Sequence, residues 1–264
     1  MSTTYPPITL PGTEVRVLHA ANIDQAYKLF IALPVGYDKT EDRYPVLYVT
    51  DANLFFGNTP LLRLPVPPMI VVGIGYPTDN RAEIARLRAR DFLPTQNKEL
   101  EAAFEAEHHV PIESGGGCTF LSFIRDQLFA FIDAEYRTKP DDRTLLCYSF
   151  GGTFGIYTLF TQPDSFKRYI IGAPGLWWDH EVCFRYEEAY AAQQTDLPVK
   201  LYLSVGTLDE DALGGMASKL FRFHSILKSR NYPGLDMKFE VFEGETHQTA
   251  ISPTISRGLR AVFS

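Results

Sequence analysis

The chain has 264 residues, of which 45% are hydrophobic and 22% charged, as is typical of a folded globular protein with a substantial core. Its formal net charge of −7, without any basic block, argues against partners such as nucleic acids or anionic membrane surfaces. No apolar run reaches the roughly 18 residues of a membrane span, and the N-terminal residues do not resemble a signal peptide.

Eight short segments have the composition of β-strands. The first two partly alternate polar and apolar residues, which predicts an antiparallel pair at an edge of the sheet. Most of the later segments are continuous apolar runs, as in strands that are covered on both faces. In chain order the eight segments are 14–18, 26–33, 45–50, 68–74, 143–147, 168–173, 199–205 and 237–242.

Apolar residues at helical spacing lie between several of these strands. The predicted helices are 120–133, 152–160, 216–229 and 253–263. Alternating strands and helices predict an α/β fold with a mostly parallel sheet, an antiparallel N-terminal edge and helices on both faces. We expect one domain over residues 1–264, in which an acidic, alanine-rich insertion around residues 93–113 forms a cap or pocket wall.

A serine follows the fifth predicted strand, in the run Cys147-Tyr148-Ser149-Phe150-Gly151-Gly152. A strand that stops at a serine and continues into a helix through glycines is the nucleophile elbow of α/β-hydrolases, usually G-x-S-x-G. Here Cys147 takes the place of the first glycine. Because S-x-G-G also begins ordinary loops and helices, the elbow needs support from a base and an acid elsewhere in the chain.

His247 and Asp209 supply that support in the expected order of serine, acid and histidine. His247 follows the last strand, where a loop can bring it over the sheet, and it would accept the proton of Ser149. Asp209 follows the preceding strand and would orient the imidazole, with Glu210 as the alternative acid. Alone, His247 could be a loop histidine and the acidic residues a solvated turn, but together they predict a catalytic serine.

An oxyanion hole needs two backbone N–H groups directed at the developing negative charge. The residue after the nucleophile, Phe150, provides the first of them. The second is expected from the loop after the third strand, where Ala52 and Asn53 are equally good candidates.

The cysteines Cys118, Cys147 and Cys183 are odd in number and widely spaced, which fits neither a disulfide framework nor a zinc site. The pair His108-His109 has no third ligand at a suitable spacing, so we expect no metal site. Reduced thiols are expected in the cytoplasm, and we predict that location.

Several segments resemble one family over most of the chain, namely the esterase family that includes esterase D and the enterobactin and salmochelin esterases. They are PVLYVTDAN (45–53), VGIGYP (72–77), RARDFLPT (88–95), SGGGCTFLSFI (114–124) and APGLWW (173–178). Cys147 and Ala52 stand where the family has glycine, and Ala173 and Gly175 replace two serines. The resemblance implies an α/β-hydrolase that cleaves a carboxylic ester through a serine acyl-enzyme, without a metal or organic cofactor.

The resemblance also suggests residues that contact the substrate. Arg90 lies in the family-like segment and could bind an acidic or catecholate group. Arg86 and Arg88 fit that role or a solvated helix face equally well. Trp177 and Trp178 could stack on an aromatic acyl group or pack together in the core.

The predicted substrate is a small-molecule ester, and a trilactone-type siderophore is the candidate that the resemblance suggests. The same machinery could instead serve an acyltransferase, or a thioesterase such as S-formylglutathione hydrolase. The substitutions at Cys147 and Ala52 leave a third alternative, a non-catalytic homologue that only binds a ligand.

Overall fold

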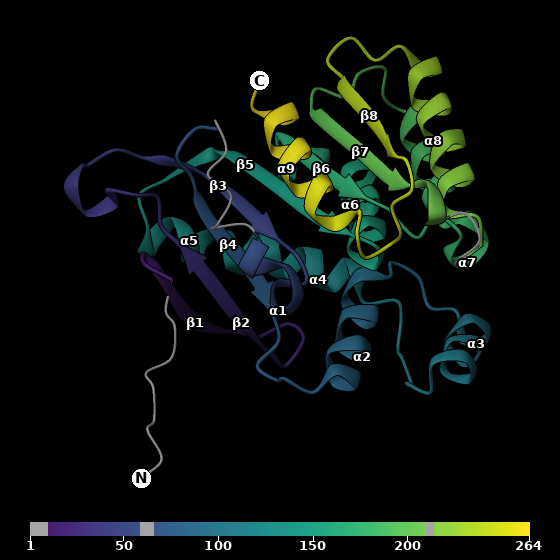
Figure 1. Cartoon of the computed structure of the whole chain (residues 1–264), viewed down its shortest axis with the longest axis horizontal. Coiled ribbons are helices and arrows are strands. Elements are labelled where there is room, and N and C mark those ends of the chain that lie inside the picture. The colour runs from purple at the N-terminus through teal and green to yellow at the C-terminus, as the bar shows by residue number, and fades with distance from the viewer. Residues whose placement is uncertain (1–9, 59–65, 210–213) are drawn as a thin grey trace.

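The strands form one continuous sheet, as the computed structural model of the chain shows (Figure 1). The structure describes residues 10–58, 66–209 and 214–264. Its eight strands are β1 (Thr13–Ala20), β2 (Gln25–Ala32), β3 (Tyr44–Val49), β4 (Ile70–Gly75), β5 (Thr138–Tyr148), β6 (Arg168–Gly172), β7 (Lys200–Gly206) and β8 (Asp236–Phe242). All eight coincide with the predicted strands to within a few residues at their ends, apart from an earlier start of β5.

The strand order is β1-β2-β4-β3-β5-β6-β7-β8. Strand β2 pairs antiparallel with β1 and with β4, and every other neighbouring pair is parallel. Strands β3 and β4 are buried at every residue, as expected for strands covered on both faces. The predicted α/β-hydrolase fold, with its antiparallel N-terminal edge, is confirmed.

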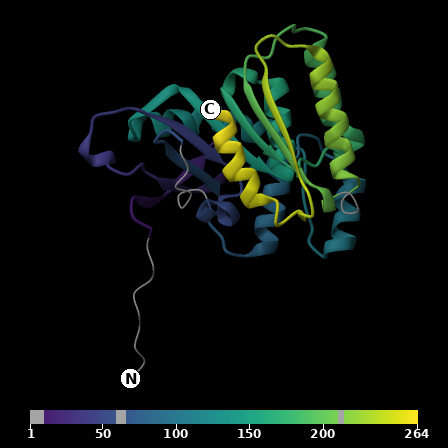
Figure 2. The ribbon, with the colours of Figure 1, turned by 45° about the horizontal axis from the view of Figure 1, so that its top comes forward.

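Helices cover both faces of the sheet (Figures 1 and 2). Their bounds are α1 (Ala52–Phe55), α2 (Arg81–Phe92), α3 (Lys98–His108), α4 (Gly117–Phe123), α5 (Phe129–Glu135), α6 (Phe150–Thr161), α7 (Trp178–Ala191), α8 (Met216–Arg230) and α9 (Ile251–Val262). A π-helical turn at Ile124–Leu128 joins α4 to α5. Both views show α9 crossing one face, while α4, α6 and α7 pack together on the other.

The four predicted helices are present, and three long ones were not predicted. The many charged residues of α2 interrupt its apolar periodicity. Helix α7 begins irregularly, because its backbone is left-handed at Asp179, His180 and Glu181. Helix α3 lies inside the segment 93–113 that was expected to form a cap.

The parallel strands share one direction, so their carboxyl ends meet at one edge of the sheet. Ser149 follows β5 and the residues 51–54 follow β3 at this edge. Asp209 ends a short 3-10 helix (Thr207–Asp209) after β7, and His247 lies between β8 and α9. The topology therefore gathers the predicted catalytic residues at one edge.

Candidate active site

Ser149 occupies the sharp turn between β5 and α6. Its backbone has φ 60° and ψ −124°, a conformation that side-chain-bearing residues rarely adopt and that is typical of a nucleophile elbow. The turn is held by hydrogen bonds, since the Ser149 N–H donates to the Gly172 carbonyl at 3.0 Å and the Thr153 N–H donates to the Ser149 carbonyl at 3.0 Å. Ser149 is half-buried and lies at the sheet edge where the parallel strands end.

Two glycines, Gly155 and Gly73, leave room for the side chains of Cys147 and Ala52. A Cβ on Gly155 of α6 would lie 2.4 Å from the Cys147 sulfur, so the glycine leaves room for the thiol. A Cβ on Gly73 would likewise lie 2.7 Å from the Ala52 Cβ. Burial, and next the Asp51 carboxylate, raises the pKa of the Cys147 thiol, which keeps this group protonated and unreactive.

His247 lies against the residue that precedes the elbow serine. The Tyr148 hydroxyl donates to the His247 carbonyl at 2.9 Å, and the two rings are 5.1 Å apart between centroids. Burial, and next the Asp209 carboxylate, raises the pKa of Tyr148, so its hydroxyl remains a donor. These contacts bring the loop of His247 to the elbow.

Asp209 and His247 face each other across this loop. Nδ1 of His247 lies 3.2 Å from Oδ1 of Asp209, whose side chain is buried. The contact is not aligned as a hydrogen bond: in the described part of the chain, Nδ1 of His247 and Oδ2 of Asp209 have no hydrogen-bond partner. The alternative acid Glu210 lies outside the described residues.

The loop at residues 51–54, here called the oxyanion loop after its predicted role, turns directly after β3. Asp51 has φ 55°, and its carbonyl accepts the N–H groups of Leu54 and Phe55 at 2.8 and 3.0 Å. The first N–H groups of a helix have no intrahelical acceptor, so those of Ala52 and Asn53 are available, as is that of Phe150 at the start of α6.

The side chain of Asn53 fixes the oxyanion loop to the end of β4. Its Oδ1 accepts the Tyr76 N–H at 2.7 Å, and its Nδ2 donates to the carbonyls of Tyr76 and Thr78 at 3.0 and 3.3 Å. Because three hydrogen bonds hold one amide, the backbone beside it has little freedom to reorient.

Arg88 provides a second restraint that the sequence did not reveal. Its Nε and a terminal nitrogen donate to the two carboxylate oxygens of Asp51 at 2.7 and 2.8 Å. The same guanidinium lies 5.3 Å from the centroid of the Phe150 ring. Arg88 therefore joins the oxyanion loop to the residue after Ser149, and the only sequence signal for it was its place in the R-x-R-D segment.

Arg90, the arginine expected to contact substrate, is engaged within the protein. Its Nε donates to the buried Asp91 at 2.8 Å, and its terminal nitrogens approach Gln25 at 3.4 and 3.5 Å. Asp91 also accepts hydrogen bonds from the hydroxyls of Tyr27 and Tyr76. A role of Arg90 in substrate binding stays a prediction, and its contacts favour a structural role.

The two tryptophans occupy different environments. Trp178 is buried, and its Nε1 donates to the Thr95 carbonyl at 3.2 Å. Trp177 is partly exposed, and its ring lies 6.2 Å from that of Phe150. Trp177 lines a cavity that is bounded on its other side by α3.

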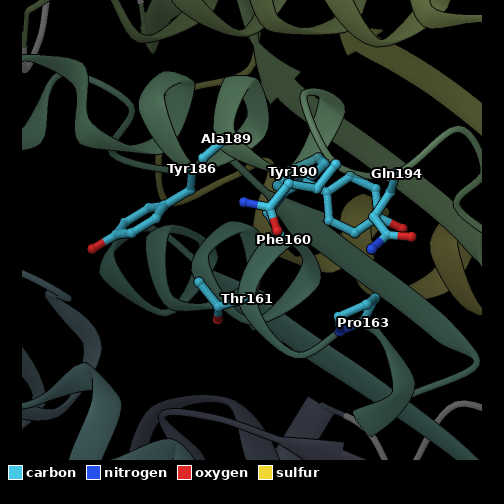
Figure 3. A pocket seen from close by; sticks show the side chains of 8 residues that line it. Phe160, Thr161, Pro163, Tyr186, Ala189, Tyr190 and Gln194 are labelled. Carbon is cyan, nitrogen blue, oxygen red and sulfur yellow. The ribbon is translucent and has the colours of Figure 1, made fainter.

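A larger hollow of about 370 Å³ lies elsewhere (Figure 3). It is lined by Phe160 and Thr161 at the end of α6 and by Tyr186 and Tyr190 of α7. Phe160 is ten residues along α6 from Phe150, a rise of about 15 Å, so this hollow is remote from the elbow.

Within the described residues, no cluster of three or more histidine, cysteine or acidic side chains could hold a metal ion. The same residues contain no helix that is both long and apolar enough to cross a membrane.

Several known proteins resemble the chain in sequence or in fold. The ferri-bacillibactin esterase BesA of Bacillus subtilis is 30% identical, in an alignment that covers 96% of this chain and 90% of the relative. The siderophore triacetylfusarinine C esterase of Aspergillus fumigatus is 24% identical, with 97% and 95% of the two chains covered.

A solved structure, the BES protein from Bacillus cereus, superimposes with a TM-score of 0.84 at 25% identity, covering 100% of this chain and 99% of that one. The model of the family described as "Putative esterase" matches residues 20–261. The chain therefore belongs to the Putative esterase family and is an ester hydrolase.

Proposed function

We propose that the chain is a serine esterase in which Ser149 is the nucleophile, His247 the general base and Asp209 the residue that orients the base. The observation that carries the proposal is the strained turn at Ser149, with His247 held against Tyr148 beside it. The strained backbone at Ser149 costs folding free energy. The same turn exposes the hydroxyl of a serine at the end of a central strand, which a nucleophile requires.

The first half of the reaction forms an acyl-enzyme. Since Nδ1 of His247 faces Asp209, its Nε2 is the nitrogen that accepts the proton from the Ser149 hydroxyl. The serine oxygen attacks the ester carbonyl, whose oxygen becomes an oxyanion. The N–H of Phe150 and that of Ala52 or Asn53 stabilise this charge. As the intermediate collapses, the imidazolium protonates the leaving alcohol and the acyl group stays on Ser149.

The second half repeats these steps with water. His247 removes a proton from the water, which attacks the acyl carbonyl, and the same N–H groups stabilise the second oxyanion. Collapse of this intermediate breaks the bond to the serine oxygen, which regains its proton from His247. The products are an alcohol, a carboxylic acid and the free enzyme.

The replacement Ser149→Ala tests the mechanism. We expect the turnover of p-nitrophenyl acetate to fall by about 10³-fold or more, because the whole triad acts through this one oxygen. A fluorophosphonate probe should label the unmodified protein at Ser149, as located by peptide mass spectrometry, and should not label the variant.

Ser225→Ala is a matched control, because Ser225 is an exposed serine of α8 whose hydroxyl donates to a local carbonyl, that of Phe221. It should keep full activity and labelling. Full activity in Ser149→Ala would show that another group attacks the ester.

For the substrate we propose an ester bond within a siderophore, because two relatives that cover nearly the whole chain are named siderophore esterases. We further propose that the whole chain is one domain and that the segment 93–113, with helix α3, acts as its cap. Hydrolysis of ferric and metal-free siderophore esters should exceed that of acyl-glutathione thioesters. Faster cleavage of the thioesters would favour the S-formylglutathione hydrolase alternative.

A cytoplasmic location is proposed on separate grounds. Cys118, Cys147 and Cys183 are all free thiols, as is usual in a reducing compartment. Cell fractionation followed by detection of the protein tests this location.

A further inference from the structure

Asp91 is a buried carboxylate near the end of α2 that the proposed mechanism does not use. It is 1% exposed. Its Oδ1 accepts a hydrogen bond from Nε of Arg90 at 2.8 Å, and its Oδ2 accepts those of the Tyr27 and Tyr76 hydroxyls at 2.7 and 3.0 Å. Hydrogen bonds to an ionised carboxylate are about twice as strong as those between neutral groups. Asp91 therefore holds the ends of two tyrosine side chains.

The two tyrosines share this acceptor but differ in what their backbones contact. Tyr27 lies within β2, and its backbone takes part in the antiparallel pairing with β1. Tyr76 directly follows β4, beyond the last residue of that strand that pairs with β2. The Tyr76 N–H donates to Oδ1 of Asn53, and its carbonyl accepts Nδ2 of the same amide, at 2.7 and 3.0 Å. The Asn53 amide thus takes the place of a neighbouring strand beside Tyr76.

Tyr76 is held at both of its ends. Its side chain is 2% exposed, and burial, and next the Asp91 carboxylate, raises the pKa of its hydroxyl, which therefore stays protonated and remains a donor. At the backbone end, the amide of Asn53 comes so close that a Cβ on Gly75 would lie 2.4 Å from its Oδ1. A glycine at the end of β4 is what permits this approach.

These contacts lead to the proposed oxyanion donors. Asn53 carries one of the two candidate N–H groups, and Ala52, which carries the other, is its neighbour in the oxyanion loop. A shift of Tyr76 would move the Asn53 side chain, and with it the backbone of the loop. Groups that act at a transition state need their positions held to within about 0.5 Å. The end of the Tyr76 side chain therefore bears on the geometry of the oxyanion hole.

We propose that Asp91 and Tyr76 are positioning residues, which hold the Asn53 amide and, through it, the backbone N–H groups of the oxyanion loop. The proposal rests on the esterase function argued above and adds a restraint to it. Because the oxyanion forms only when the ester carbonyl is attacked, this restraint acts on the transition state and not on the binding of the substrate.

The replacements Tyr76→Phe and Tyr27→Phe form a matched pair. Each keeps a buried ring and removes one hydroxyl from the same carboxylate oxygen. The midpoint of urea unfolding should therefore fall in both variants. Only Tyr76→Phe should lower kcat for p-nitrophenyl acetate, by about tenfold, with KM changed less than about twofold. Complete loss of one oxyanion donor would cost more, about 10²–10³-fold.

The inhibitor 1,1,1-trifluorobutan-2-one reports on the oxyanion itself. The Ser149 oxygen adds to its carbonyl carbon, the serine proton passes to His247, and the carbonyl oxygen becomes an oxyanion in a stable tetrahedral adduct. The inhibition constant Ki should rise about tenfold in Tyr76→Phe and stay unchanged in Tyr27→Phe. A role confined to folding would lower the stability of both variants and leave both Ki values unchanged.

Gly75→Ala acts on the other end of the same contacts, because its Cβ would displace the Asn53 amide while both tyrosine hydroxyls remain. It should raise Ki by a similar factor, and it decides the question if Tyr76→Phe does not fold. Asn53→Ala removes the amide outright. Adding Tyr76→Phe to Asn53→Ala should then cause no further rise in Ki, since the two residues no longer act on each other.

An unchanged Ki in Tyr76→Phe, or in Gly75→Ala if only that variant folds, would overturn the proposal. Equal rises of Ki in Tyr76→Phe and Tyr27→Phe would overturn it too, as would a rise in the double variant equal to the product of the two single rises. Failure of the esterase function itself looks different, because the ketone would then neither inhibit the unmodified protein nor protect Ser149 from the fluorophosphonate probe.

Discussion

The two sides of the elbow are held in different ways. On the oxyanion side, Asn53 makes three hydrogen bonds to the end of β4, and Arg88 forms a two-pronged ion pair with the buried Asp51. On the acid–base side, Asp209 and His247 meet through a single 3.2 Å contact that is not aligned as a hydrogen bond. The first side is fixed before substrate binds, and the second can tighten on binding.

This difference matches the demands of the two tasks. Stabilising an oxyanion depends on donors whose positions do not change as charge develops, because reorganisation would cost energy at the transition state. In the proposed mechanism, His247 must instead exchange protons with three different partners, namely the serine, the leaving alcohol and water. A long apo contact that shortens in the reacting complex is compatible with that role.

The largest effect is expected from Arg88→Met. Removing this guanidinium leaves the Asp51 carboxylate, which is 1% exposed, without its charged partner. Breaking a buried pair in this way costs about 3–5 kcal/mol of folding free energy. We also expect kcat for p-nitrophenyl acetate to fall, because the oxyanion loop and Phe150 lose their common contact. Urea unfolding and steady-state kinetics measure the two effects.

Arg86→Met is the control on the same helix, since the ion pair of Arg86 with Glu113 is long, at 3.4 Å, and exposed. It should change stability by less than about 1 kcal/mol. The double variant Asp51→Asn with Arg88→Met removes the unpaired charge, so it should recover stability but not kcat. Recovery of both would mean that Arg88 serves folding alone.

Asp209→Asn breaks the weaker side, and its effect should be smaller than that of Ser149→Ala. We expect kcat to fall by at most about 10²-fold, the lower end of the contribution of positioned acid–base groups. The carboxamide can still contact Nδ1 of His247, although without the negative charge that stabilises an imidazolium. A loss of about 10⁴-fold would contradict this, and would mean that the contact closes into a strong hydrogen bond during turnover. His247→Ala in the same assay gives the upper limit.

The sequence predicted the parts of the site that depend on strand ends. Ser149, His247 and Asp209 each follow a parallel strand, and a parallel sheet brings such positions together whatever the loops do. Their order along the chain, serine, acid and then histidine, is that of α/β-hydrolases and predicted the role of each residue. The oxyanion residues Ala52 and Asn53 were located by the same logic and stay predictions, as do the catalytic roles.

Side-chain partners were beyond the reach of the sequence. Arg86, Arg88 and Arg90 lie two residues apart on one helix, and nothing in that spacing indicates that Arg88 binds Asp51 and Arg90 binds Asp91. Helix α3 lies in the segment that the sequence predicted only as a cap. Its contact with the elbow, through Phe104 and Phe150, joins residues 46 positions apart, and no local pattern indicates it. Such pairings are set by tertiary packing, which overrides local pattern.

The smallest expected effect concerns the packing of Gly155 in α6 against Cys147 at the end of β5. In Gly155→Ala, the new Cβ would lie 2.4 Å from the Cys147 sulfur and 3.2 Å from two side-chain carbons of Ile171. Overpacking of this kind costs about 1–3 kcal/mol, against a gain in helix propensity of about 1 kcal/mol for alanine over glycine. We therefore expect a net loss of up to about 2 kcal/mol, measured by urea unfolding.

Introducing Gly155→Ala into a Cys147→Ala background separates these terms, because the sulfur is then absent and the helix propensity remains. In that background Gly155→Ala should leave the free energy of unfolding unchanged or raise it. The double variant should then be more stable than the sum of the two single effects predicts. Equal losses in both backgrounds would place the strain at Ile171 rather than at Cys147. A neutral or stabilising outcome would mean that Gly155 on α6 is what allows the chain to carry a thiol at the position where the usual nucleophile elbow has its first glycine.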